Sequence, residues 1–339
     1  MSDDLEPLPP AEAVNLYLDH REPDVSTKTL QNQRYRLNAF LEWCDENGLE
    51  NLNDLSGRDL HRYRTWRSEQ VNAVTLRGEL ATLRVFLEFC ASIDGVEHGT
   101  RERVLLPDVS RDQEAKDVEL TDERAHRILD HLEKFRYASR DHVIMAVLWH
   151  TGIRLGTLRA LDLRDWDPEE PCLDVRHRPE TDTPLKNAGA ANRSIAVGPG
   201  YAEVIEDYIE HNRHAVVDDH GREPLLTSSQ GRFSSTAIRN TIYRLTRPCM
   251  VRDCPHDRDP ETCEAMEPDQ ASRCPTSRSP HAIRRGSITH QLREQIPQRV
   301  VEERSNVSGD VLEQHYDERS EREKMRLRSD FIQNLRDNK

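Results

Sequence analysis

The chain has 339 residues, which is long enough for two domains that each bury an apolar core. Its formal net charge is -14, which taken alone argues against a polyanionic partner such as nucleic acid. No apolar run is long enough to span a bilayer, and the acidic N-terminus is unlike a signal peptide, so we expect a cytoplasmic protein without a membrane partner.

The composition is also unusual in its balance of residue types. Asp and Glu are abundant, lysine is scarce, and aromatic residues make up 5% of the chain. This balance fits a halophilic protein that must stay soluble in a very salty cytoplasm. Salt of that strength weakens DNA binding that depends on counterion release. The alternative is an acidic protein with no role on nucleic acid.

The N-terminal third predicts a helical domain. Residues 1–10 are acidic and contain proline, and we expect a disordered lead-in there. Cap residues and apolar spacing predict a compact domain of four helices over residues 11–100, followed by a linker at 101–117. The four helices are residues 11–20, a segment capped by Ser26, a segment opened by Ser56, and residues 74–93.

Arginine outnumbers acidic residues in the second half of this domain. A local basic surface on an acidic protein is the electrostatic pattern expected of a DNA contact. The alternative is salt bridging along a helix, such as Arg84 with Glu88. The arginines concerned are Arg58, Arg62, Arg64, Arg67, Arg77 and Arg84.

Residues 118–339 predict a second domain, in which helices accompany a small sheet. A helix capped by Thr121 precedes a second helix, residues 140–150, which is apolar nearly throughout and therefore buried. Alternating residues at 172–176 and 193–197 predict two strands. Further helices are expected at residues 201–212, 235–247 and 320–336.

The exit of the buried helix carries the first candidate for a functional residue. Gly152 ends that helix, and Arg154 follows at once in the segment HTGIRLG. A guanidinium beside a buried helix is costly unless it meets an anion. The alternative is that an arginine here pairs with Asp162 or Asp165.

A second group of candidates lies between Ser279 and Tyr316. Ser279 suits a helix cap and Pro280 the first turn, and His281 and Arg284 then leave the same face of that helix. Tyr316 ends a later, short amphipathic segment. A donor pair on one helix and a phenol on another can both reach a phosphate.

A cysteine-rich insertion at residues 249–274 precedes that helix. Its thiols, together with His256, can form a tetrahedral zinc site, which would stabilise a segment too polar to fold by apolar burial. The tight Cys-x-x-Cys spacing is absent, so reduced thiols without a metal are the alternative. The predicted ligands are Cys249, Cys254, Cys263 and Cys274.

These motifs, in this order, resemble those of the tyrosine recombinase family, which includes phage integrases and Xer recombinases. The resemblance rests on Arg154 in T-G-x-R, Lys186 in a β-hairpin, His281 and Arg284 in H-x-x-R, and Tyr316 near the C-terminus. It implies an N-terminal SAM-like core-binding domain and a mainly α catalytic domain with a small antiparallel β-sheet, an α+β fold. It also implies double-stranded DNA as partner and self-association on DNA in a tetrameric synapse, by a protein that can be a monomer in solution.

The same resemblance assigns roles to these residues. The arginines neutralise a phosphodiester, Tyr316 is the nucleophile, His281 accepts its proton or bonds the phosphate, and Lys186 protonates the leaving 5′ oxygen. No cofactor is needed for catalysis. The sequence departs from the family about ten residues before the tyrosine, where a His or Trp is usual and Asn306 is the nearest polar residue. Asn306 is therefore the candidate for a third phosphate contact, without charge or proton.

Two functions are compatible with this pattern. The first is a site-specific recombinase or integrase that cleaves and rejoins DNA strands through a covalent 3′-phosphotyrosine. The alternative is a catalytically degenerate DNA-binding regulator, in which zinc at the cysteine-rich insertion can stabilise the fold.

Overall fold

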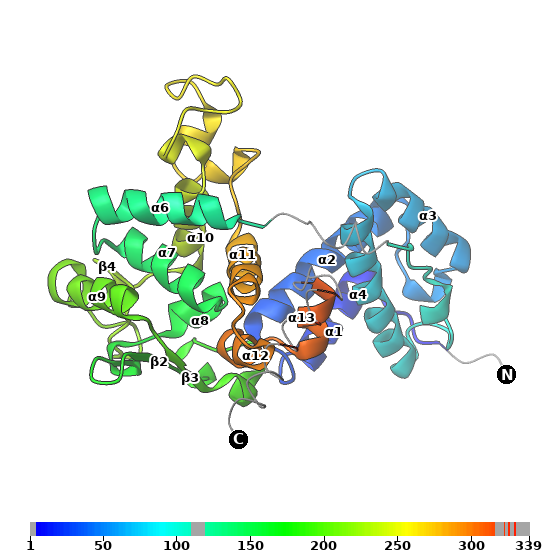
Figure 1. Cartoon of the computed structure of the whole chain (residues 1–339). Coiled ribbons are helices and arrows are strands. Elements are labelled where there is room, and N and C mark those ends of the chain that lie inside the picture. Colours follow the sequence, from blue (N-terminus) through cyan, green and yellow to red (C-terminus); the bar gives the residue numbers. More distant parts are fainter. Residues whose placement is uncertain (1–4, 110–118, 316–321, 323–324, 326–328, 330–339) are drawn as a thin grey trace. The chain divides into compact units, whose positions relative to one another are not determined.

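The computed structural model describes residues 5–109, 119–315, 322, 325 and 329 (Figure 1). The chain divides into two compact units, Met1–Asp117 and Val118–Lys339. The fold is mainly helical with small antiparallel sheets, so the predicted fold class is confirmed. None of the helices in the described residues has the length and apolar character needed to cross a membrane.

The N-terminal unit is built from four α-helices. Three of them begin after a residue whose side chain accepts a hydrogen bond from the first turn, namely Ser26, Ser56 and Asn72. The four helices predicted from the sequence are all present, and the two predicted at residues 11–20 and 74–93 have ends within one residue of those expected. Their bounds are α1 (Pro10–Arg21), α2 (Thr27–Glu46), α3 (Gly57–Ser68) and α4 (Ala73–Ser92).

The core of this unit follows from the spacing of apolar residues on α4. Leu76, Leu80, Leu83 and Leu87 recur every three or four residues, and all four are buried. They belong to one apolar cluster that also contains residues of α1, α2 and α3. The unit therefore has a core of its own.

The arginines of this unit are partly engaged within it. The alternative of salt bridging along a helix is confirmed at Arg62, which pairs with Asp59 at 3.3 Å, but not for Arg84 and Glu88, because Arg84 Nε donates to the carbonyl of Val104 at 2.8 Å and Glu88 pairs with Arg101. Arg67 forms an ion pair with the buried Glu79, with an N–O distance of 2.7 Å. Three others, Arg58, Arg62 and Arg77, have exposed side chains.

The C-terminal unit is organised around α7. Nearly every residue of this helix is buried, because α6, α8, α9, α10 and α11 all pack against it. The bounds are α6 (Asp122–Phe135), α7 (Arg140–Thr151), α8 (Leu155–Ala160), α9 (Pro199–Asp207), α10 (Ser235–Leu245), α11 (Pro280–Arg293), α12 (Gln298–Ser305) and α13 (Gly309–His315).

A three-stranded antiparallel sheet, in the order β1-β2-β3, lies beside these helices. Leu173 pairs with Ile195 across β2 and β3, and both are buried. The two predicted strands are confirmed. The other strands and α12, which packs on β3, were not predicted. The strands are β1 (Trp166–Asp167), β2 (Cys172–Val175) and β3 (Arg193–Ala196), with a separate pair β4 (Thr227–Ser228) and β5 (Gly231–Arg232).

The last helices form a small apolar cluster with α11. Ile288 and Leu292 of α11 pack with Val301 of α12, with Val307 between α12 and α13, and with Leu312 of α13. Apolar contacts of Leu312 therefore hold α13 against α11 and α12. The helix predicted at residues 320–336 lies, for the most part, outside the described residues.

Candidate active site

The α7–α8 turn positions Arg154. Gly152 ends α7 in the left-handed conformation, with φ 64°, and a Cβ added there would lie 3.2 Å from Ser287 Oγ of α11. The backbone of this turn therefore approaches α11 closely. Arg154 precedes the first residue of α8, and its Nη1 donates to the carbonyl of Asn306 at 3.0 Å.

Other arginines engage the carboxylates that were the alternative partners for this segment. The alternative is confirmed for Arg164, whose Nε lies 3.3 Å from Asp162 Oδ2; Asp162 also pairs with Arg222 at 2.8 Å and with Arg232 at 2.6 Å. Asp165 pairs with Arg178 at 2.6 Å. Arg154 Nη1 instead donates to the carbonyl of Asn306.

Arg284 projects from α11 toward the same turn. Ser279 caps α11 by accepting from Ala282 N–H, and Pro280 occupies the first turn, as the sequence predicts. The Arg284 side chain is only 4% exposed. Its Nη1 donates to the carbonyl of Gly152 at 2.7 Å and to that of Ser305 at 2.6 Å.

Three consecutive carbonyls at the end of α12, those of residues 304–306, organise the arginines; we call this segment the 304–306 turn. Arg193 Nε donates to Arg304 O at 2.9 Å, Arg284 to Ser305 O, and Arg154 to Asn306 O. These carbonyls are at the negative end of the helix, where cations are stabilised. The 304–306 turn is therefore contacted by three guanidiniums, from the residue before α8, from β3 and from α11.

The positive potential at this point is visible in pKa shifts. Burial, followed by the charges of Arg284 and Arg154, lowers the pKa of Arg193 to about 10. Desolvation lowers the pKa of His281 below its ordinary value, and the charges of Arg284, Arg285, Arg154 and Lys186 lower it further. His281 is therefore a neutral imidazole at pH 7, close to the predicted arginines and lysine.

Lys186 lies in the long connection between β2 and β3. Leu185, just before it, is buried, and its N–H donates to His177 Nδ1 at 2.9 Å. Asn187, just after it, is left-handed with φ 76°. Lys186 itself is exposed. The anchored leucine and the turn therefore present the lysine at the surface.

The side chain of Asn306, the last residue of the 304–306 turn, contacts the β2–β3 connection. It adopts the left-handed conformation after α12, with φ 53°, and Asn187 Nδ2 donates to its Oδ1 at 3.4 Å. The next residue, Val307, turns its side chain into the apolar cluster of α11–α13. The Asn306 amide thus contacts Asn187, the residue after Lys186, and its role as a phosphate contact stays a prediction.

The predicted nucleophile, Tyr316, lies outside the described residues. The described chain reaches His315, the last residue of α13. Leu312, four residues before Tyr316, is buried in the α11–α13 cluster. That cluster also includes Val301 and Val307, which lie on either side of the 304–306 turn in the sequence, and Ile288 of α11, the helix that carries Arg284.

The cysteine-rich insertion contains thiols that are not in disulfides, and it forms the yellow loop beyond α10 in Figure 1. Burial raises the pKa of Cys249, and nearby Cys274 and Cys254 raise it further. The four cysteines do not, however, meet within 4.8 Å; among described residues, the group of three or more potential ligands that does so is Asp122, His126 and His290. That group was not predicted from the sequence, because His290 is far from Asp122 and His126 along the chain.

Arg193 is the other residue that the sequence analysis missed. It was assigned only to a strand, yet its guanidinium contacts the 304–306 turn together with Arg154 and Arg284. Side chains alternate along a strand, and Arg193 shares a face with the buried Ile195. That alternation was the available signal.

Family comparisons cover both units. Residues 15–92 match the phage integrase N-terminal SAM-like domain, and residues 119–321 match the phage integrase family. Tyrosine recombinase XerC of Escherichia coli O157:H7 is 27% identical over 239 residues, covering 68% of this chain and 76% of XerC. XerC of Shigella flexneri is 26% identical over the same length.

Solved structures share the fold at low identity. The Tn1549 transposon integrase in complex with a circular intermediate DNA is 14% identical, with TM-score 0.70, over 96% of this chain and 99% of that one. A lambda integrase dimer bound to a COC′ core site is 15% identical, with TM-score 0.65, over 94% of this chain and 80% of that one.

Proposed function

The chain belongs to the phage integrase family, and from that membership we propose that it is a site-specific DNA recombinase which acts through a covalent 3′-phosphotyrosine. The observation that carries the proposal is the convergence of Arg154 and Arg284, 130 positions apart, on adjacent carbonyls of the 304–306 turn. The Tn1549 and lambda integrases were solved bound to DNA, which supports double-stranded DNA as the partner here.

The first requirement of the reaction is neutralisation of the phosphodiester. Arg154 and Arg284 carry forked donors that stay charged at any working pH, and they come from two different elements. Donors held in advance toward the non-bridging oxygens stabilise the charge that grows there in the transition state. Asn306 adds an uncharged amide to this group.

Strand cleavage exchanges one phosphoester for another. The Tyr316 oxygen attacks the phosphorus, the bond to the 5′ oxygen breaks, and the 3′ end stays attached to the tyrosine. An ordinary phenol has a pKa of roughly 10, so its proton must be accepted. His281 suits this task because its pKa is lowered and the ring is neutral at pH 7. Lys186 gives a proton to the departing 5′ oxygen.

Rejoining reverses these steps and needs no nucleotide cofactor, because the phosphotyrosine preserves the energy of the broken bond. The N-terminal unit contributes a DNA contact through its exposed arginines, Arg58, Arg62 and Arg77. We propose that the protein acts in a salty cytoplasm, as a monomer that assembles into a tetrameric synapse on DNA. Structural zinc at Cys249, Cys254, Cys263 and Cys274 remains a proposal, which requires the thiols to move together.

The test is covalent trapping on a nicked suicide substrate that loses the short strand after cleavage. We expect wild-type protein to form a denaturant-resistant DNA adduct. Tyr316→Phe should bind the same DNA and form none, because it lacks the attacking oxygen. Tyr137→Phe is the matched control: this exposed tyrosine bonds Asp207 at 2.6 Å, and its loss should leave the adduct unchanged.

Two outcomes would contradict the proposal. An adduct formed by Tyr316→Phe would show that another residue attacks. Wild-type protein that binds the substrate but forms no adduct would favour the degenerate DNA-binding regulator. The regulator is favoured by Asn306 and the buried Val307, which bring neither a histidine nor a tryptophan to this part of the site.

A further inference from the structure

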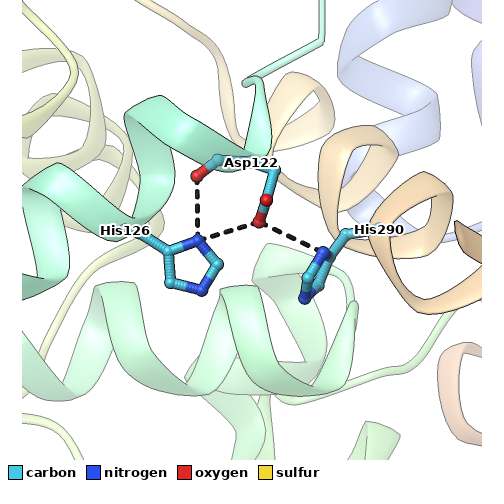
Figure 2. Close-up of side chains that lie close together, drawn as sticks. All are labelled: Asp122, His126 and His290. Carbon is cyan, nitrogen blue, oxygen red and sulfur yellow. Dashed lines mark hydrogen bonds and ion pairs between the residues drawn. The ribbon is translucent and has the colours of Figure 1, made fainter. Parts of the chain in front are cut away.

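A group of two histidines and one aspartate lies at the junction of α6 and α11, apart from the candidate active site (Figure 2). Asp122 is the first residue of α6, His126 follows one turn later, and His290 is in the last turn of α11. Asp122 Oδ1 lies 2.8 Å from His126 Nδ1 and 3.1 Å from His290 Nδ1. All three potential ligand atoms lie within 4.8 Å of one another.

Trp149 packs against both histidine rings, while the His126 and Asp122 side chains remain 48% and 46% exposed. Trp149 of α7 stacks on the His290 ring, with 5.5 Å between centroids, and meets the His126 ring edge-on at 6.2 Å. The start of α6 is bonded to α11 through Leu120 N–H and Ala282 O at 3.0 Å. Gly286 allows this approach, since a Cβ there would lie 2.0 Å from Leu120 O. The two ligand-bearing helices are therefore held together by contacts independent of the group.

The chemistry of the three atoms suits a metal ion of the zinc class. Imidazole nitrogen and carboxylate oxygen bind such ions at about 2.0–2.2 Å, which separates neighbouring tetrahedral ligands by roughly 3.4 Å. The two printed separations from Asp122 Oδ1 would widen by about 0.6 Å for His126 and about 0.3 Å for His290, and the third pair lies within 4.8 Å. In addition, Asp122 Oδ1 is buried and, within the described part of the chain, receives no hydrogen bond of normal geometry.

We propose that Asp122, His126 and His290 bind a divalent transition-metal ion that joins α6 to α11. His126 Nδ1 also lies 3.0 Å from the backbone carbonyl of Asp122, so binding requires the tautomer with its proton on Nε2. Three protein ligands leave a fourth position for water. The ion is structural, because the predicted catalytic residues lie on other parts of the unit, with His281 nine residues before His290 on α11.

Cobalt(II) titration of the full-length protein, stripped of metal with a chelator, tests this proposal. We expect about one ion per chain with the visible bands of nitrogen and oxygen ligands. Asp122→Asn, His126→Ala and His290→Ala should each weaken this binding by at least about 10–100-fold, the loss typical even of indirect ligand partners. His131→Ala on the same helix is the matched control and should bind as wild type. Circular dichroism checks that each variant is folded.

The difference between the wild-type and Asp122→Asn spectra separates this site from the cysteine-rich insertion. Cysteine ligands add a thiolate-to-cobalt charge-transfer band, and an ion bound there would be unaffected by Asp122→Asn. A zero difference spectrum, whether cobalt binds at the thiols or nowhere, would overturn the proposal and leave the group as a histidine–aspartate ion pair. Zinc should also raise the melting temperature of wild type but not of Asp122→Asn.

Discussion

For Arg193, the sequence predicts which face of its strand the side chain occupies, but it does not predict the group that the side chain contacts. Alternation along β3 places its side chain on the buried face with Ile195, and that much is readable from the sequence. Its acceptor, Arg304 O, is 111 residues away at the end of a helix with only two buried residues. No local pattern connects the two. By contrast, Arg154, His281 and Arg284 were found through motifs whose spacing the family resemblance supplied.

Replacing Arg193 by lysine tests whether the two hydrogen bonds donated by its guanidinium position the 304–306 turn. Lysine cannot reproduce both the bond to Arg304 O at 2.9 Å and that to Ala191 O at 2.7 Å. We expect the free energy of unfolding to fall by about 1–3 kcal/mol and DNA cleavage to slow. Urea denaturation and single-turnover cleavage of the suicide substrate measure the two effects.

The control is Arg176→Lys, because Arg176 follows β2 and forms a half-exposed pair with Asp174 at 3.1 Å. Such pairs contribute little to stability, so both measurements should match wild type. Cleavage by Arg193→Lys at the wild-type rate would show that the turn does not depend on this guanidinium.

At the scale of elements, α7 is the central helix of the C-terminal unit and carries two enclosed histidines. Ala138 N–H donates to His142 Nδ1 at 3.3 Å, and Gly198 N–H donates to His150 Nε2 at 3.0 Å. Burial lowers the pKa of each histidine to about 4, and the charge of Arg304 lowers that of His150 further. Both rings are therefore neutral hydrogen-bond acceptors in the folded protein.

These depressed pKa values predict acid lability. Above pH 6.5 the rings are neutral in both states, whereas below it the unfolded chain gains protons that the folded chain does not gain until about pH 4. Stability is thus present above pH 6.5 and lost as pH falls toward 4. Each histidine should reduce the free energy of unfolding by about 2 kcal/mol between pH 7 and pH 5.

Urea denaturation of His150→Gln across that pH range measures this effect. Glutamine keeps an acceptor for Gly198 N–H but does not titrate, so the pH dependence should become shallower. The exposed His211→Gln is the matched control and should retain the wild-type pH dependence. An unchanged pH dependence in His150→Gln would contradict the assignment of a neutral, buried ring.

Long helices and their starting residues were predictable because capping and apolar spacing are local properties. Ser26, Ser56 and Ser279 each cap the helix expected of them. The missed elements lack such signals. α12 follows Pro297 without a side-chain cap, and the two-residue strands are too short to show alternation. It is this unpredicted helix that supplies the acceptors of the site.

At the scale of the whole molecule, each unit contains a separate apolar cluster. The cluster around Phe86 lies within the N-terminal unit, and the cluster around Trp149 lies within the C-terminal unit. From the glycine, proline and charged residues of 94–116, which show little periodicity, the sequence predicts a linker at residues 101–117. Because each unit has its own apolar cluster, we expect each to fold separately.

We therefore expect residues 119–339, expressed alone, to unfold cooperatively and to bind target DNA more weakly than the intact chain. The number of DNA phosphates contacted by the two units is additive. The DNA-binding constant of the intact chain should therefore decrease more steeply with salt concentration, on logarithmic axes, than that of the C-terminal unit. Fluorescence anisotropy over a salt series measures both slopes. Equal slopes and affinities would show that the arginines of the N-terminal unit make no phosphate contacts.

The 304–306 turn has a consequence for redesign. Because main-chain oxygens hold Arg193, Arg284 and Arg154, the alignment of these cations does not depend on which side chain occupies position 306. The residue at position 306 must adopt a left-handed backbone conformation, which Gly and Asn adopt readily. Position 306 is thus a site where the chemistry offered to DNA can be varied while the framework that aims the cations stays intact.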